Sequence, residues 1–210
     1  MTAREEVLAR IQAALRSGGG TGPDDGFVTD QYRTSGDVSG LQLIDLLADR
    51  LIDYRAIVRR ASQATLTAEV GAALAERGAR RLVVPPGLAI ELPGWAEVTV
   101  DKGLMPAELD TYDGVVSRAA VAIAETGTIV LDGSAGQGRR AITLVPDYHL
   151  CVVEASQVVH LVPEAVARLA GAVDRPLTWI SGPSATSDIE LERVEGVHGP
   201  RTLEVVLVTD

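Results

Sequence analysis

The chain of 210 residues contains little cysteine and few histidines. Its single cysteine, Cys151, excludes a disulfide within the chain, and it excludes any zinc or iron–sulfur site built only from this chain's cysteines. Cys151 stands between apolar residues, which is typical of a small buried side chain and not of a reactive thiol. Three histidines in the whole chain likewise give no support for a dedicated metal site.

Aromatic residues and long apolar runs are also scarce. Only 3% of the residues are aromatic although 46% are hydrophobic, so the core must be built from Val, Leu, Ile and Ala. Such a composition is typical of parallel strands that are buried on both faces and covered by Ala-rich helices. No apolar run approaches the roughly 20 residues that span a bilayer, and the N-terminal sequence lacks the apolar core of a signal peptide. We therefore expect a cytoplasmic protein that has no membrane segment.

Basic residues are in the minority. The chain has 19 Lys and Arg against 29 Asp and Glu, which gives a formal net charge of −10 at pH 7. A charge of this sign repels the phosphate backbone of nucleic acids and the surface of anionic membranes. Neither nucleic acid nor membrane is therefore expected as a partner, whereas a local basic pocket for a small anion stays open.

The first 40 residues differ in composition from the rest of the chain. Apolar residues between Val7 and Leu15 recur at helical spacing and predict an N-terminal helix over residues 1–16. Residues 17–40 are rich in Gly, Asp, Ser and Thr and show no hydrophobic periodicity, which is typical of a flexible linker. A helix on such a linker is free to dock elsewhere, and association of two copies through this arm is one interpretation.

Predicted helices and strands alternate over residues 41–210, which we interpret as one domain. This alternation predicts an α/β fold with a mostly parallel sheet and helices on both faces. Residues 119–125 fit either a strand or the start of a helix. The predicted strands include residues 55–61, 81–85, 150–153, 177–181 and 203–208. One predicted helix begins near residue 39, and three others cover residues 67–77, 163–173 and 186–194.

Three segments beside predicted strands carry polar side chains, and ligands of open α/β sheets bind beyond the carboxyl ends of strands. The first segment contains Glu125, Thr126 and Gly127 between two apolar runs. A half-buried glutamate needs a partner, and a neighbouring glycine lets a substrate approach the backbone closely. An equally supported interpretation is that Glu125 caps a turn or pairs with an arginine.

The second segment, residues 181–190, follows the predicted strand at residues 177–181. A glycine-containing turn, a cluster of hydroxyl groups and the start of a predicted helix favour the binding of an anion. The alternative is that one hydroxyl is only a helix N-cap and that the following acid interacts with the helix dipole. The phosphate-loop and dinucleotide-binding fingerprints are both absent. The residues selected by the anion-binding interpretation are Gly182, Pro183, Ser184, Thr186 and Asp188.

The third segment contains His198, which lies between glycines that include Gly199. Imidazole acts as an acid or a base near neutral pH, so His198 is a candidate catalytic residue and Gly199 a candidate for ligand contact. The alternative is a hydrogen-bonded structural histidine, because one sequence shows no partner for the ring. His149 and His160 flank the strand that begins at Leu150, and we interpret both as strand-end residues and not as ligands.

Taken together, these segments resemble the lactate-utilisation (LUD) domain family, in particular its short stand-alone C-type members. The resemblance rests on the order and spacing of the motifs, and it runs from about residue 40 to the end of the chain. It implies a three-layer α/β sandwich similar to the fold of sugar-phosphate isomerases and coenzyme A transferases. The motifs are residues 122–129, Leu144-Val145-Pro146 with His149, Ser181-Gly182-Pro183-Ser184 with Asp188-Ile189-Glu190, and Gly196-Val197-His198-Gly199-Pro200.

The resemblance also implies a role in the oxidation of L-lactate to pyruvate, alongside two partner proteins of which one carries iron–sulfur clusters. This chain lacks the cysteines for such clusters, so we expect no cofactor in it and place the clusters on the partners. Ala185 stands where the family pattern is often basic, and Arg139 or Arg140 is therefore expected to contact a carboxylate or phosphate. In the related transferases a glutamate on a strand loop is the nucleophile, and Glu125 is its counterpart here.

Two other functions stay open beside a subunit of a lactate-oxidising system. One is a free-standing isomerase or acyl-transferase that uses Glu125, and the other is a regulatory module that binds a small carboxylate without chemistry. These residues do not decide whether the isolated chain is an enzyme. Each function depends on Glu125, the Ser184 turn and His198 converging at one rim of a shared sheet.

Overall fold

The computed structural model describes residues 3–17, 32–172, 174–186, 194–195 and 198–210. By their contacts, residues 1–33 and residues 34–210 form two units. The first unit contains helix α1 (Ala3–Ser17), whose Val7 and Ile11 side chains are exposed. None of the described helices has the length and apolar character needed to cross a bilayer.

The second unit is built on a six-stranded sheet in the order β1-β12-β7-β4-β2-β3, in which every neighbouring pair is parallel. Strand β12 lies between β1 and β7, and its Glu204 pairs with Ile57 of β1. β7 and β12 are buried along almost their whole length, as the apolar runs in the sequence predict. The strands are β1 (Ile57–Ala61), β2 (Arg81–Val84), β3 (Glu97–Val100), β4 (Gly114–Arg118), β7 (Tyr148–Glu154) and β12 (Thr202–Val208).

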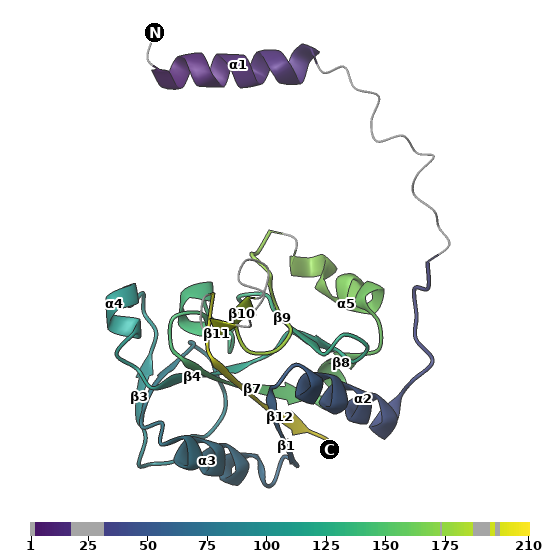
Figure 1. Ribbon diagram of the computed structural model, residues 1–210, viewed down its shortest axis with the longest axis vertical. Coiled ribbons are helices and arrows are strands. Elements are labelled where there is room, and N and C mark those ends of the chain that lie inside the picture. Colours follow the sequence, from purple (N-terminus) through teal and green to yellow (C-terminus); the bar gives the residue numbers. More distant parts are fainter. Residues whose placement is uncertain (1–2, 18–31, 173, 187–193, 196–197) are drawn as a thin grey trace. The chain divides into compact units, whose positions relative to one another are not determined.

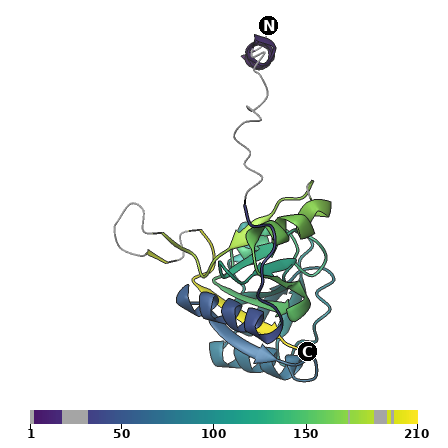
Figure 2. The ribbon, with the colours of Figure 1, turned by 90° about the vertical axis from the view of Figure 1, so that its right-hand side faces the viewer.

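Helices cover the two faces of this sheet. Cys151 packs on the face covered by helix α2 (Gly40–Asp53), and its neighbour Leu150 packs on the face covered by helix α3 (Leu66–Arg77). Side chains of successive strand residues point to opposite faces, so the two helices lie on opposite sides of the sheet. Figures 1 and 2 show them with the yellow strand β12 between them. The predicted α/β sandwich with a mostly parallel sheet is therefore confirmed.

A second sheet packs on the α2 side of the first, and the sequence analysis predicts the strand at residues 177–181 that belongs to it but not a separate sheet. It has the order β8-β5-β6-β9, with antiparallel pairs on both sides of β6. One face of this sheet joins the core beneath α2, and the other packs against helix α5 (Val162–Arg168) and the turn η3 (Leu169–Ala172). Within residues 119–125, which fit strand or helix, residues 121–123 form strand β5. The strands are β5 (Val121–Ile123), β6 (Thr128–Leu131), β8 (Val158–Val159) and β9 (Thr178–Ile180).

The predicted helix over residues 186–194 falls mostly on residues 187–193, which lie outside the described part of the chain. Its two described ends belong to strands β10 (Ala185–Thr186) and β11 (Val194–Glu195), which pair antiparallel. His149 is the second residue of β7, which begins at Tyr148, so it lies at the end of a strand as the sequence predicts. The remaining described elements are the short helix α4 (Pro106–Leu109) and the turns η1 (Arg140–Thr143) and η2 (Ala155–Gln157).

Candidate functional site

A cavity of about 270 Å³ opens where the segment after β9 meets the segment before β12. The beginnings of β7 and β12 contribute His149 and Leu203 to its lining, so it lies at the amino ends of these two parallel strands. The expectation that ligands bind beyond the carboxyl ends of strands holds at this cavity only for β9, because the Ser181 segment follows the carboxyl end of that strand. The lining residues are Arg140, Thr143, Leu144, His149, residues 178–184, His198, Gly199, Pro200 and Leu203.

The structure brings the second and third predicted segments together at this cavity. The backbone N–H of His198 donates to Ser184 Oγ at 2.9 Å, and the backbone N–H of Ser184 donates to the carbonyl of Pro200 at 2.9 Å. These two hydrogen bonds fix the two turns to each other, and the exposed residue His198 lies at the rim of the cavity. Gly182, Pro183, Ser184, His198 and Gly199, which the sequence selects, all line the cavity.

Arg140 supplies positive charge to the cavity. It is the only Lys, Arg, Asp or Glu among the described residues of the lining, and none of its side-chain nitrogens has a partner in the described part of the chain. Four hydroxyl groups line the same cavity. In a chain of net charge −10, a lining with a guanidinium, hydroxyls and no described carboxylate favours a small anion. The hydroxyl groups belong to Thr143, Thr178, Ser181 and Ser184.

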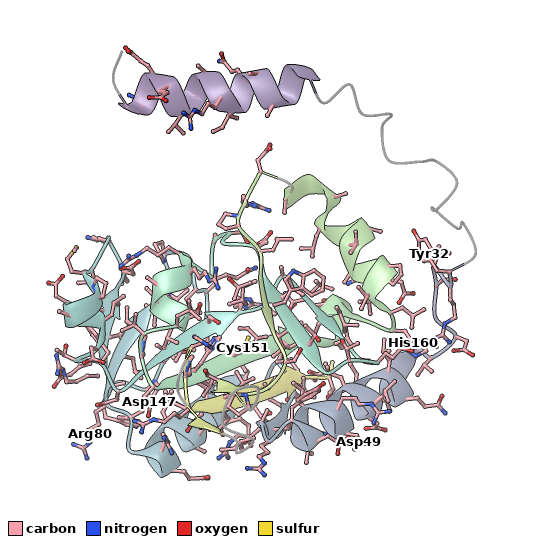
Figure 3. The ribbon with its side chains drawn as sticks, turned by 45° about the horizontal axis from the view of Figure 1, so that its top comes forward. Tyr32, Asp49, Arg80, Asp147, Cys151 and His160 are labelled. Carbon is pink, nitrogen blue, oxygen red and sulfur yellow. The ribbon has the colours of Figure 1, made fainter. Side chains whose placement is uncertain are left out.

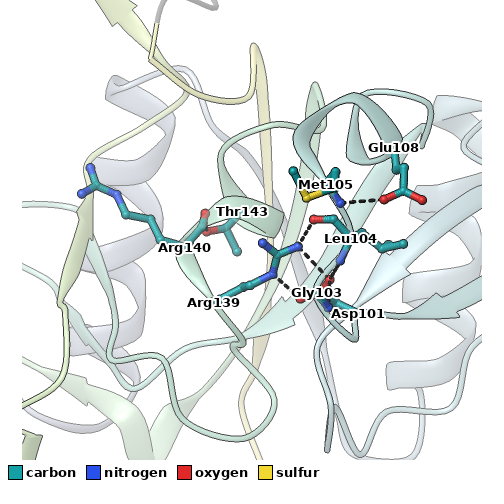
Figure 4. Close-up of polar contacts among 8 residues, drawn as sticks. All are labelled: Asp101, Gly103, Leu104, Met105, Glu108, Arg139, Arg140 and Thr143. Atoms are coloured by element: carbon teal, nitrogen blue, oxygen red, sulfur yellow. Dashed lines mark hydrogen bonds and ion pairs between the residues drawn. The ribbon is translucent and has the colours of Figure 1, made fainter.

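Arg139 points elsewhere, as Figure 4 shows. Its Nε and Nη2 atoms donate to the two carboxylate oxygens of Asp101 at 2.6 and 2.9 Å, and Nη2 also donates to the carbonyl of Leu104. This guanidinium, together with the backbone N–H groups of Leu104 and Gly103, holds the pKa of Asp101 below its usual range despite burial. Arg139 therefore fixes the loop after β3, and it does not line the cavity.

His149 is a cavity residue that the sequence analysis missed. Its side chain is almost completely buried, and its Nε2 lies 2.7 Å from Ser117 Oγ of β4. Its Nδ1 is buried and has no hydrogen-bond partner among the described residues. Burial lowers the pKa of His149 to about 4, so the ring is neutral at pH 7. The apolar sequence around it was a sign of burial, and a buried imidazole needs a partner.

Glu125 lies outside the lining of the cavity. It is exposed on the turn between β5 and β6, where its backbone N–H donates to the carbonyl of His160 at 3.1 Å. A chain of hydroxyl groups nevertheless joins this turn to the rim. Thr126 Oγ1 lies 2.8 Å from Thr128 Oγ1, which lies 2.8 Å from Ser181 Oγ. The structure thus connects the first predicted segment to the cavity without placing the Glu125 carboxylate in it.

Close backbone packing explains the glycine in each of two predicted segments. A Cβ on Gly127 would lie 2.8 Å from Arg50 Cβ, and one on Gly182 would lie 2.7 Å from Tyr54 Cβ. Both glycines have positive φ angles, +58° and +84°, which other residues rarely adopt. They seat the second sheet against the end of α2, and a role toward a ligand is not needed to account for them.

Thr186 belongs to β10, and Asp188 lies outside the described residues. Within the described part of the chain, no group of three or more His, Cys, Asp or Glu side chains is arranged to hold a metal ion. The candidate site is therefore a small cavity that combines a cation, hydroxyls and two imidazoles.

The chain is similar in sequence to proteins of a known family. Residues 42–208 match the family model of the LUD domain. Lactate utilization protein C of Deinococcus radiodurans is 44% identical over 213 residues, which cover 98% of this chain and 95% of that protein. Lactate utilization protein C of Bacillus subtilis (strain 168) is 27% identical over 233 residues, which cover 99% and 96% of the two chains.

A solved structure has the same fold. The crystal structure of a DUF162 family protein from Deinococcus radiodurans superposes with a TM-score of 0.72 at 41% sequence identity. The match covers 82% of this chain and 99% of the crystallised chain. The arrangement of the two sheets and the helices is therefore shared with a protein whose fold is known by experiment.

Proposed function

Because the chain belongs to the LUD domain family, we propose that it acts in lactate utilisation, as a subunit or accessory protein of a system that oxidises L-lactate to pyruvate. Relatives named lactate utilization protein C, one of them 44% identical over nearly the whole chain, support this role. The observation that carries the proposal to the residues is the cavity, whose described lining contains a cation and no carboxylate.

In this proposal the cavity binds a small carboxylate. Arg140 and the hydroxyl groups of Thr178, Ser181 and Ser184 donate hydrogen bonds to the carboxylate, and bonds from a charged donor are stronger than neutral ones. Ligand sites for drug-sized molecules measure roughly 300 to 1,000 Å³. A cavity of about 270 Å³ therefore suits an acid of few atoms, such as lactate or pyruvate.

Electron transfer is assigned to partner proteins with iron–sulfur clusters. The only cysteine of this chain, Cys151, is completely buried, and burial raises the pKa of its thiol to about 12. A thiol of this kind keeps its proton and is a poor metal ligand, because metals bind the thiolate. We therefore propose that this chain has no cofactor of its own and contributes substrate binding to an assembly.

Deletion of the gene tests the role in lactate utilisation. We expect the deletion strain to lose growth on L-lactate but not on glucose, and we expect the wild-type gene to restore growth. A gene with Arg140→Ala should fail to restore growth on L-lactate, because the variant lacks the positive charge that binds the carboxylate of the ligand. Normal growth of the deletion strain on L-lactate would contradict the proposal.

A matched control separates loss of the site from loss of one positive charge. Arg80 is exposed, and Figure 3 shows its side chain pointing away from the protein. Arg80→Ala makes the same change in net charge and should restore growth fully. In calorimetry with the purified chain, Arg140→Ala should weaken L-lactate binding by about tenfold or more, as expected for a lost hydrogen bond to a charged group.

The two alternative functions stay predictions with separate tests. A free-standing isomerase or acyl-transferase requires turnover by the purified chain, and Glu125→Gln should then reduce it by about a hundredfold or more. A regulatory module requires binding of lactate, pyruvate or an acyl-coenzyme A without turnover. Copurification from cells grown on lactate distinguishes both from a subunit, because only a subunit is expected to bring iron–sulfur proteins with it.

A further inference from the structure

We infer that His149 recognises the oxygen atom on carbon 2 of the ligand and donates a hydrogen bond to it from Nδ1. The inference rests on the proposed function, since it takes the ligand to be a short carboxylic acid. It narrows the ligand class to 2-hydroxy and 2-oxo acids, and it gives His149 the role of a specificity residue.

The position of the ring carries the first step. His149 lies in β7 between Val115 of β4 and Leu203 of β12, so three parallel strands hold its backbone. The side chain lines the cavity although it is 1% exposed, which places it at the inner end of the space. A ligand held by Arg140 at one end of the cavity can therefore meet the imidazole at the other.

The hydrogen bonds of the ring carry the second step. Nε2 is engaged by Ser117 Oγ at 2.7 Å, whereas Nδ1 is buried and has no partner in the described part of the chain. A buried polar atom without a partner costs free energy, and native proteins keep few of them. A ligand oxygen in the adjoining cavity gives Nδ1 the partner that the described residues do not provide.

The proton of the neutral ring is placed on Nδ1 as part of the same inference, because a carbonyl oxygen such as that of pyruvate can only accept a hydrogen bond. Ser117 Oγ lies 2.7 Å from His149 Nε2 and has one hydroxyl proton, and in this inference it donates that proton to Nε2.

The tautomer of His149 follows from this donation. A neutral imidazole has one N–H, and a ring that accepts at Nε2 must carry its proton on Nδ1. The lowered pKa of His149, about 4, keeps the ring neutral at pH 7. The cavity therefore contains a neutral donor at its inner end and a cationic donor at Arg140, which matches an acid with a second oxygen beside its carboxylate.

Calorimetry with the full chain tests the inference, using L-lactate, pyruvate and propionate. Propionate has the charge and nearly the size of lactate but lacks the oxygen on carbon 2. We expect lactate and pyruvate to bind about tenfold or more tightly than propionate, because a site built to hydrogen-bond an oxygen rejects an analogue without it. His149→Phe should bring lactate and pyruvate down to the affinity of propionate.

Two further variants guard against a merely structural effect. His149→Asn keeps an amide near the position of Nδ1 and should restore part of the preference for lactate. Ser117→Ala keeps the ring but removes the group that fixes its tautomer, and it should reduce the preference. The matched control is His160→Phe, because His160 is also buried but does not line the cavity, and it should bind the three acids as the wild type does.

The outcomes separate this inference from the proposed function. Equal affinity of the wild type for lactate and propionate overturns the role of His149 and leaves the cavity as a general carboxylate site. Absence of binding for all three acids contradicts the carboxylate site itself. If His149→Phe fails to fold, an unchanged preference in Ser117→Ala overturns the inference.

Discussion

His149 and His160 look alike by burial and differ in what lies beside them. Both rings are buried, with exposed fractions of 1% and 8%, and in both the Nδ1 atom has no hydrogen-bond partner among the described residues. His149 lines a cavity, whereas the backbone of Gly36 covers His160. A buried nitrogen without a partner therefore indicates a ligand only where space for a ligand adjoins it.

The cover over His160 is closely fitted. A Cβ added to Gly36 would lie 1.9 Å from His160 Nδ1, so only glycine fits there. The backbone N–H of Gly36 donates to Glu164 Oε1 at 3.1 Å, and the other oxygen of Glu164 accepts from the backbone N–H of Leu161 at 2.7 Å. The Asp37 carboxylate lies 3.7 Å from His160 Nδ1, beyond hydrogen-bond distance. Figure 3 shows His160 at the edge where this segment passes.

Low pH should have the largest effect on stability, through the buried ring of His149. Its pKa is about 4 in the folded chain and about 6.5 in the unfolded chain, so the unfolded state binds more protons between these values. The contribution of the neutral His149 ring to the free energy of unfolding is fully present above pH 6.5. It is lost as the pH falls toward 4, by about 3 kcal/mol in total. Urea unfolding at pH 7 and pH 4.5 should show a greater loss for the wild type than for His149→Phe. Equal losses would mean that His149 is not buried as a neutral ring.

Opening the cover over His160 should have the next largest effect. Gly36→Ala forces a methyl group into the ring, so the segment must lift and lose the hydrogen bond to Glu164. We expect a loss of about 2 kcal/mol of unfolding free energy and faster hydrogen exchange at residues 34–39, with unchanged lactate binding. The control is Gly94→Ala, which meets no atom within 4 Å. Weaker lactate binding in Gly36→Ala would show that the two regions are coupled.

Glu125 belongs to the surroundings of His160, since its backbone N–H donates to the carbonyl of that residue. Its exposed position outside the lining of the cavity leads us to expect that Glu125→Gln changes the affinity for lactate by less than about twofold, as most exposed substitutions do. Calorimetry measures this directly. A large loss of affinity or turnover would favour the hypothesis that Glu125 is the nucleophile.

Regular patterns in the sequence predict the central sheet well. The apolar runs of β7 and β12, the burial of Cys151 and the end of α3 at Arg77 all follow from composition and spacing. The second sheet is harder to predict, because β5 and β6 are short and buried on both faces and have no strand periodicity.

The candidate site depends on partners that are distant in the sequence. Arg139 and Arg140 are adjacent and chemically identical, but Asp101 and the carbonyl of Leu104 hold the Arg139 side chain away from the cavity. His149 becomes a cavity residue through Ser117 and through the turn that contains His198. Spacing along one chain does not contain such information, because it is set by which strands become neighbours.

The position of β12 has a consequence for synthesis of the protein. β1 and β7 are both made before β12, yet β12 is the strand that joins them, with Glu204 beside Ile57 and Val205 beside Cys151. A nascent chain that has reached residue 200 therefore has β1 and β7 without the strand that joins them, and its sheet cannot close. Such long-range closure is slow, and exposed edges invite pairing with other chains. Ribosome-associated chaperones are expected to matter more for this fold than for one that closes strand by strand.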